Sequence, residues 1–155
     1  MGTKSKGDLK GQRRRGERGA TLVEFSIGAL VFLTSVFAVL EFGRLLWVHN
    51  ALTDAARRGA RYAINHTQTD AESAKRMAVY GTLSDGATPM VSGLTTGQVK
   101  VTYNNFNVGE GTVTVQIDSY DFQFVVPLVG RTIRMPNYTS TLTGENAGTE
   151  PAALP

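Results

Sequence analysis

The feature that most constrains this chain is a long apolar run from Ala20 to Leu40, which follows a strongly basic N-terminal segment. At about 1.5 Å per residue, a helix over this run is roughly 31 Å long and matches the hydrocarbon core of a bilayer. A cleaved secretory signal usually has an apolar core of about 7 to 15 residues, followed by a small-x-small cleavage motif that this sequence lacks. The run therefore predicts a membrane-spanning helix, either a permanent signal anchor or the N-terminal helix of a pilin-type protein.

The positive charge of the chain is concentrated before this run. Residues 1–19 contain seven lysines and arginines and two acids, so this segment carries +5. Subtracting that charge from the +3 of the whole chain leaves −2 for residues 20–155. Basic residues on one side of a span orient that side toward the cytoplasm, so residues 1–19 predict a cytoplasmic leader. The acidic remainder argues against a nucleic-acid-binding protein.

The helical pattern continues past the apolar run, so we expect one long helical segment over residues 20–64. Within it, small residues recur at every fourth position and form one smooth face: Ala51, Ala55, Gly59 and Ala63. Small-xxx-small faces let another helix approach closely in membranes. Alanine is also the best helix former, and the same face could cover the chain's own sheet. The sequence leaves both interpretations open.

The rest of the chain predicts a small α+β head over residues 65–143. We expect a short helix over 70–81, capped by Thr69 or Asp70, and then a surface connection over 83–97 that is rich in Gly, Ser, Thr and Pro. Alternating apolar and polar residues over 99–104 and 113–118 predict a hairpin with its turn at Gly109–Gly111. Further strands are expected over 120–126 and 138–142, giving an antiparallel sheet of about three to four strands. Residues 144–155 predict a disordered tail.

Motifs for catalysis are missing from the sequence. The chain has no cysteine, which excludes disulfides, thiol catalysis and thiolate metal sites. His49 and His66 fit no metal-binding spacing, and no nucleophile elbow, Walker or dinucleotide-binding motif is present. We therefore predict no catalytic residue, no metal site, no cofactor and no small-molecule substrate.

Two segments resemble a known family. Residues 19–25 read GATLVEF, and residues 41–63 read EFGRLLWVHNALTDAARRGARYA. Both are similar to the TadE-like family of tight-adherence (Tad, or Flp-type) pilus systems, whose members are regarded as minor pilins or pseudopilins. The resemblance covers roughly residues 16–64 and is weaker at Val126–Leu128. It implies that a prepilin peptidase, an aspartyl peptidase, cuts after Gly19 and leaves Ala20 as the first mature residue and Glu24 as the fifth.

Glu24 is the acid that lies a few residues inside the apolar run. A charge at the centre of a bilayer costs about 2.5 to 3.5 kcal/mol on insertion scales, and less near an interface. Cleavage would create an α-amino group on Ala20, and Glu24 of one subunit could pair with this amine on a neighbour, which offsets part of both desolvation penalties. The alternative is that Glu24 lies near the interface and reaches water without a partner.

These observations together predict a structural protein of pilus assembly and not an enzyme. The expected protein crosses the bacterial inner membrane once, with its N-terminus in the cytoplasm and its head in the periplasm. Its expected partners are the membrane, the prepilin peptidase, and other minor pilins and pilus assembly components. The alternative function is an uncleaved, signal-anchored scaffold or receptor-type binding protein, and cleavage of the leader distinguishes the two.

Overall fold

A computed structural model describes residues 8–107, 110–125 and 132–144 of the chain. It divides into two units, Met1–Phe42 and Gly43–Pro155, and each is described by itself. The helices are α1 (Asp8–Ile64), η1 (Gln68–Asp70), α2 (Ala71–Tyr80) and η2 (Thr96–Gln98). The strands are β1 (Val99–Asn107), β2 (Glu110–Ile117), β3 (Asp121–Gln123), β4 (Thr132–Arg134) and β5 (Tyr138–Thr143). The predicted α+β class is confirmed, although α1 begins at Asp8 and so includes part of the expected leader.

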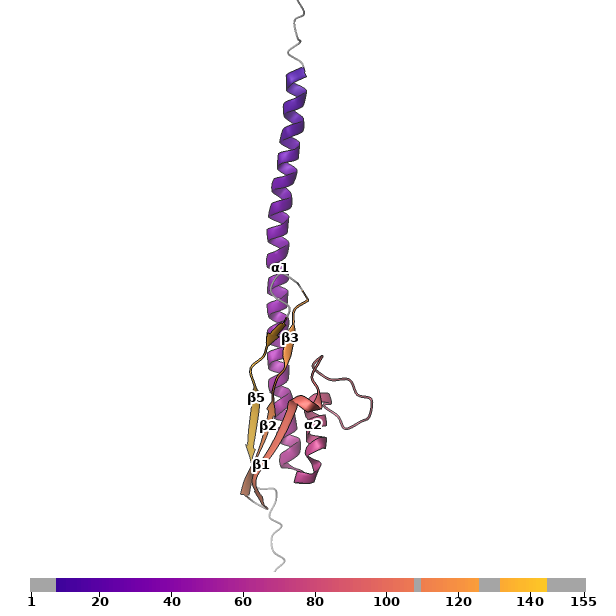
Figure 1. The fold of residues 1–155 in the computed structure, drawn as a ribbon, viewed down its shortest axis with the longest axis vertical. Helices are drawn as coiled ribbons and strands as arrows, with labels where there is room; N and C mark the ends of the chain where they lie inside the picture. Colours follow the sequence, from indigo (N-terminus) through magenta and orange to yellow (C-terminus); the bar gives the residue numbers. More distant parts are fainter. Residues whose placement is uncertain (1–7, 108–109, 126–131, 145–155) are drawn as a thin grey trace, which may run out of the picture. The chain divides into compact units, whose positions relative to one another are not determined.

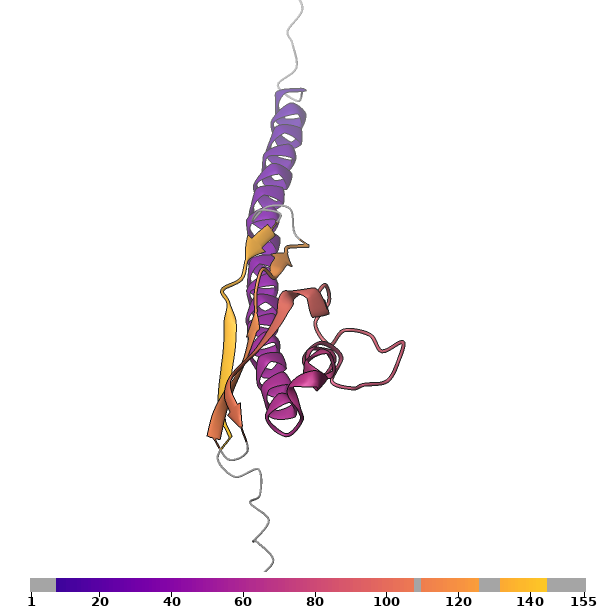
Figure 2. The same ribbon diagram turned by 60° about the horizontal axis from the view of Figure 1, so that its bottom comes forward.

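The main sheet is antiparallel, with strand order β1-β2-β5 (Figures 1 and 2). In its register Val101 lies opposite Val115, and Val115 lies opposite Ser140. Alternate side chains of β2 are fully buried, namely Val113, Val115 and Ile117, because successive residues of a strand point to opposite faces. The predicted hairpin is therefore confirmed. Of the turn expected at Gly109–Gly111, Glu110 and Gly111 belong to β2, and residues 108–109 lie outside the described part.

The C-terminal part of α1 lies along the buried face of this sheet, as Figures 1 and 2 show. Leu52, Ala56 and Ala60 of α1 have almost no exposed surface and belong to the same core as the β2 valines. Helix α2 adds Ala74, Ala78 and Val79 to this core. The head is therefore two layers around one hydrophobic core, with helices on one side and the sheet on the other.

Helix α2 occupies the predicted position but is not capped as predicted. Asp70 is the N-cap residue, yet neither it nor Thr69 caps the helix through its side chain. The Asp70 carboxylate instead accepts a hydrogen bond from the Thr67 hydroxyl at 3.0 Å, which turns it away from the first turn of α2. The helix ends at Gly81, whose φ of 69° is a left-handed conformation that glycine adopts without strain.

The connection between α2 and β1 is only partly a surface segment. Val91 and Leu94 are both 1% exposed and join the core, which the aperiodic sequence did not reveal. Arg76 holds the first part of this segment, since it donates to the carbonyl oxygens of Leu83 and Ser84 at 3.0 Å. A loop that supplies core residues is fixed by them, so this segment is part of the packed head.

The strand expected over 120–126 is shorter than expected, and it does not join the main sheet. Strand β3 covers only Asp121–Gln123 and pairs with β4 in a separate two-stranded sheet. Strand β4 was not predicted, because Thr132–Arg134 is too short to show an alternating pattern. Residues 126–131 lie outside the described part of the chain, as does the predicted tail over 144–155 except for Gly144, whose amide donates to the carbonyl oxygen of Gly111. Strand β5, in contrast, covers the expected strand at 138–142.

Candidate processing and assembly site

The first part of α1 exposes its apolar side chains. Phe25 is 72% exposed and Val39 is 71% exposed, and large aliphatic and aromatic residues between them are exposed in the same way. Among the described residues, the segment from Gly19 to Ile64 is the one helical segment long and apolar enough to cross a membrane, and none of its most apolar window is buried. A contiguous apolar surface of this size needs lipid or another protein to cover it.

Three hydroxyl groups in this apolar segment are satisfied within the helix. Ser26 donates to the carbonyl oxygen of Leu22 at 2.7 Å. Thr34 and Ser35 donate to the carbonyl oxygens four residues before them, each at 2.8 Å. A hydroxyl bonded in this way presents no unpaired donor to hydrocarbon, where an unsatisfied polar group costs several kcal/mol. Glu24 is then the only charged side chain between Gly19 and Leu40.

The bond between Gly19 and Ala20 lies inside α1, and both residues are exposed. A Cβ atom added to Gly19 would meet no atom within 4 Å, so packing within the described structure does not require glycine there. Glu24 is also exposed and lies one helical turn after Ala20. The helix thus places the predicted processing site and the lone acid on one accessible stretch of chain.

The small-residue face of α1 is used within the chain. Ala55, Gly59 and Ala63 are buried, and Ala51 is half-buried. A Cβ atom added to Gly59 would lie 3.0 Å from Cβ of Ala78 in α2 and 3.2 Å from Cγ1 of Val115 in β2. Both neighbours belong to the same head, so in this conformation no room remains on this face for a helix of another subunit.

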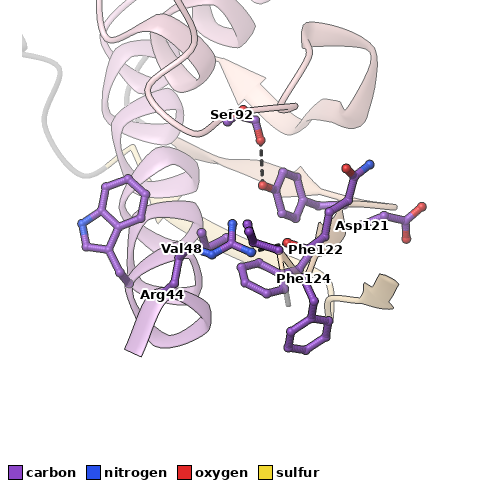
Figure 3. Close-up of a pocket in the computed structure, with 10 residues that line it drawn as sticks. Arg44, Val48, Ser92, Asp121, Phe122 and Phe124 are labelled. Carbon is purple, nitrogen blue, oxygen red and sulfur yellow. Dashed lines mark hydrogen bonds between the residues drawn. The ribbon is translucent and has the colours of Figure 1, made fainter. Parts of the chain in front are cut away.

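An open cavity of about 330 Å³ lies between α1 and the segment around β3 (Figure 3). The guanidinium of Arg44 lies over the ring of Phe122, with its Cζ atom 4.4 Å from the ring centroid, and donates to the carbonyl oxygen of Gln123. Tyr120 donates its hydroxyl to the carbonyl oxygen of Ser92 at 2.7 Å. Burial raises the pKa of this tyrosine above its usual value, so the hydroxyl remains a donor. These contacts fasten β3 and the loop before β1 to the core.

Residues 19–61 match the model of the TadE-like protein family. This part of α1 is a TadE-like segment. The chain matches no curated protein and no solved structure at a significant level. The match begins at Gly19, the residue before the predicted cut, and indicates a part in Tad pilus assembly. Together with the apolar helix it indicates a protein anchored in a membrane by a single span.

Residues of the TadE-like segment make contacts with the rest of the head that the sequence did not predict. The sequence assigned no contact to His49, but its Nδ1 lies 2.9 Å from the hydroxyl of Tyr138. The contact of Arg44 with Phe122 had no local signal, because 78 positions separate the two residues. In contrast, the aromatic residues at alternate positions, Tyr120, Phe122 and Phe124, could have predicted that their side chains share one face of a strand and point toward the core. Among the residues described, no group of three His, Cys, Asp or Glu side chains is placed to hold a metal ion.

Proposed function

We propose that this chain is a minor pilin or pseudopilin of a Flp-type (type IVb) tight-adherence pilus and acts structurally in pilus assembly. A prepilin peptidase cuts it between Gly19 and Ala20. The mature protein spans the bacterial inner membrane, with Ala20 on the cytoplasmic side and the head in the periplasm. Its partners are the peptidase, other minor pilins and pilus assembly components.

The observation that carries this proposal is the position of Glu24 in the TadE-like segment. It is the lone charge of an exposed apolar helix, and it lies five residues after Gly19, where the family match begins. Helical side chains lean toward the N-terminus, so a carboxylate at position 24 is directed toward the level of Ala20, about 6 Å away along the axis. After cleavage, the new amine of Ala20 on a neighbouring subunit is a matching partner for this acid. Pairing lowers the cost of keeping both charges in lipid.

Cleavage requires α1 to open near the cut. In a helix the carbonyl oxygen of Gly19 is the acceptor for the amide of Val23, and this hydrogen bond must break before a peptidase reaches the carbonyl carbon. Gly16 and Gly19 lower the cost of opening, because glycine is less favourable than alanine in a helix by about 1 kcal/mol per residue. Since packing does not require Gly19, its presence supports a role in processing.

The deciding experiment measures the intact mass and the N-terminal residue of the protein from membranes with and without the prepilin peptidase. The proposal expects a chain beginning at Ala20, lighter by about 2 kDa, only when the peptidase is present. A leader retained in both membranes would refute the proposal and leave an uncleaved, signal-anchored scaffold or receptor as the better account.

A matched pair of glycine variants separates recognition of the cut from general effects on the helix. Gly19→Ala and Gly28→Ala each add one methyl group at a position with no neighbouring atom within 4 Å. Both should insert and fold as the parent chain does. Only Gly19→Ala should accumulate with its leader attached, and equal processing of the two variants would contradict the assigned cut.

A further inference from the structure

The head exposes large apolar side chains mainly near the start of its part of α1 and on the segment around β3 and β4. In the described part of the head, four of these side chains form what we call the apolar rim: Leu46, Trp47, Val125 and Ile133. Trp47 is 59% exposed and Ile133 is 47% exposed. Contiguous exposed apolar surface on a soluble domain marks a place where protein or lipid binds.

Contacts within the head hold β3 and β4 at the level of Arg44 and Trp47 on α1 (Figure 3). The guanidinium of Arg44 lies over the ring of Phe122, with its Cζ atom 4.4 Å from the ring centroid. Strand β4 lies at the same level, because Phe122 is the partner of Ile133 in the register of the two strands. Trp47 lines the same open cavity as Phe122. The hairpin of β3 and β4 is therefore fixed to the first turns of α1 in the head.

The end of β5 lies far from the apolar rim. A Cβ atom added to Gly144, directly after β5, would lie 3.7 Å from Cδ1 of Ile64. Ile64 is the last residue of α1, and 20 residues of helix after Arg44 extend about 30 Å. Figures 1 and 2 show β3 and the end of β5 at opposite ends of the head. Thr143, exposed at the end of β5, is thus a reference point remote from the rim.

The chain itself keeps the apolar rim near the end of the apolar run. Leu40 ends this run, and Arg44 and Trp47 follow it by four and seven residues of the same helix, or about 6 and 10 Å. The headgroup zone on each side of a bilayer is about 5 to 8 Å thick. Helical side chains lean toward the N-terminus, so the ring of Trp47 leans back toward Leu40. These distances along α1 are the same at any angle between the head's strands and the membrane.

The chemistry of the rim fits a lipid surface. Tryptophan is typical of the membrane–water boundary, because its ring is apolar and its N–H can bond to a headgroup. Asp121 and Arg134 lie opposite each other in the register, so the described part of the hairpin has no net charge. Along the chain, the rim follows the exposed apolar segment that ends at Leu40, which is 62% exposed. Lipid that covers the first surface is therefore the nearest cover for the second.

We propose that the head rests on the membrane through Trp47 and the hairpin of β3 and β4. Ile133 enters the boundary between headgroups and acyl chains, while the end of β5 stays in water. The partner is the phospholipid surface in which α1 is anchored. This inference goes beyond the proposed function, because it needs only the single membrane span and neither the cut nor a pilus.

Quenching of tryptophan fluorescence by brominated phosphatidylcholine tests this contact on the full chain in lipid vesicles. Trp47 is the only tryptophan, so Trp47→Phe gives a silent background. Ile133→Trp then reports the rim, and Thr143→Trp is the matched control at the end of β5. Bromine near the headgroup end of the acyl chain should quench Ile133→Trp several-fold more than Thr143→Trp. Equal quenching would overturn the proposal: at a low level the hairpin is away from lipid, and at a high level the whole head lies on the surface.

Two further measurements keep the test decisive. Val125→Trp, at a position that is 76% exposed, is a second rim reporter and replaces Ile133→Trp if urea titration shows that this variant does not fold. Quenching of either rim reporter should be the same over a wide range of protein-to-lipid ratios. Quenching that disappears at high protein density would show that a second copy covers the rim, and would also overturn the proposal.

Discussion

Substitution of Gly59 by alanine tests whether the small-residue face of α1 is filled by the chain's own head. The added Cβ atom would lie 3.0 Å from Cβ of Ala78, 3.2 Å from Cγ1 of Val115 and 3.3 Å from the carbonyl oxygen of Ala74. All three distances are shorter than ordinary carbon contacts of about 3.5 to 4.0 Å. One neighbour is backbone and another is a short side chain, so neither can simply rotate away.

Gly43 provides the matched control, because it lies on the same helix and an added Cβ atom there meets nothing within 4 Å. Replacing a helical glycine with alanine is favourable by about 1 kcal/mol where space is free. Overpacking a filled site costs about 1 to 3 kcal/mol. Gly43→Ala should therefore be more stable than the parent chain by about 1 kcal/mol, and Gly59→Ala about 0 to 2 kcal/mol less stable than the parent.

The free energy of unfolding is measured by urea titration of the full chain in detergent micelles. Fluorescence of Trp47, the only tryptophan, reports the transition, because this residue lines the cavity beside β3. The decisive quantity is the difference between the two variants, expected at about 1 to 3 kcal/mol, since the gain in helix propensity is common to both. Equal stabilisation by both substitutions would show that Gly59 is not packed against α2 and β2, and would refute the reasoning.

Three further outcomes are expected. Glu24→Gln should leave membrane insertion intact and reduce piliation, because it removes the charge proposed to pair with the amine of Ala20; normal piliation would count against this pairing. Phe122→Ala should lower the free energy of unfolding by about 3 to 5 kcal/mol, because Phe122 is 1% exposed and supports the Arg44 guanidinium. Hydrogen bonds from Lys100 and Gln116 hold the pKa of Asp118 below its usual value. Its contribution to stability is therefore present above the unfolded pKa of about 3.9 and is lost as the pH falls through the folded pKa. Acid titration of Asp118→Asn should show a weaker loss of stability in that range than the parent chain shows.

The sequence was sufficient for elements whose pattern is local and repeated. The apolar run of α1, the alternation along β1 and β2, and the strand at β5 each extend over six or more residues, so the pattern alone predicts the element. Contacts between distant positions left no such signal. Val91 and Leu94 are single apolar residues in an aperiodic loop, and only the folded core shows that both are buried. Likewise, pairing of β3 with β4 depends on three residues of each strand.

The residues of the candidate site also differ in whether a local sequence pattern could predict their role. Gly19 and Ala20 were predicted as the processing site from the family resemblance, and Glu24 stood out as the acid inside the apolar run; all three residues are exposed. The use of the small-residue face could not be decided from spacing, because an alanine stripe packs equally well on a foreign helix and on the chain's own sheet. The three-dimensional neighbours of Gly59 supply the missing information.

The glycines of α1 therefore have different physical roles although they look alike in the sequence. Gly59 is required by close packing inside the head, whereas Gly19, Gly28 and Gly43 have open space where a side chain would be. A helical glycine with no packing partner in its own chain costs about 1 kcal/mol of helix stability without compensation there. The proposed cut by a peptidase would account for the glycine at position 19, and packing among the described residues accounts for neither Gly28 nor Gly43. Contacts of α1 with other subunits should therefore involve the exposed segment before Gly43 and not the face that contains Ala55 and Ala63.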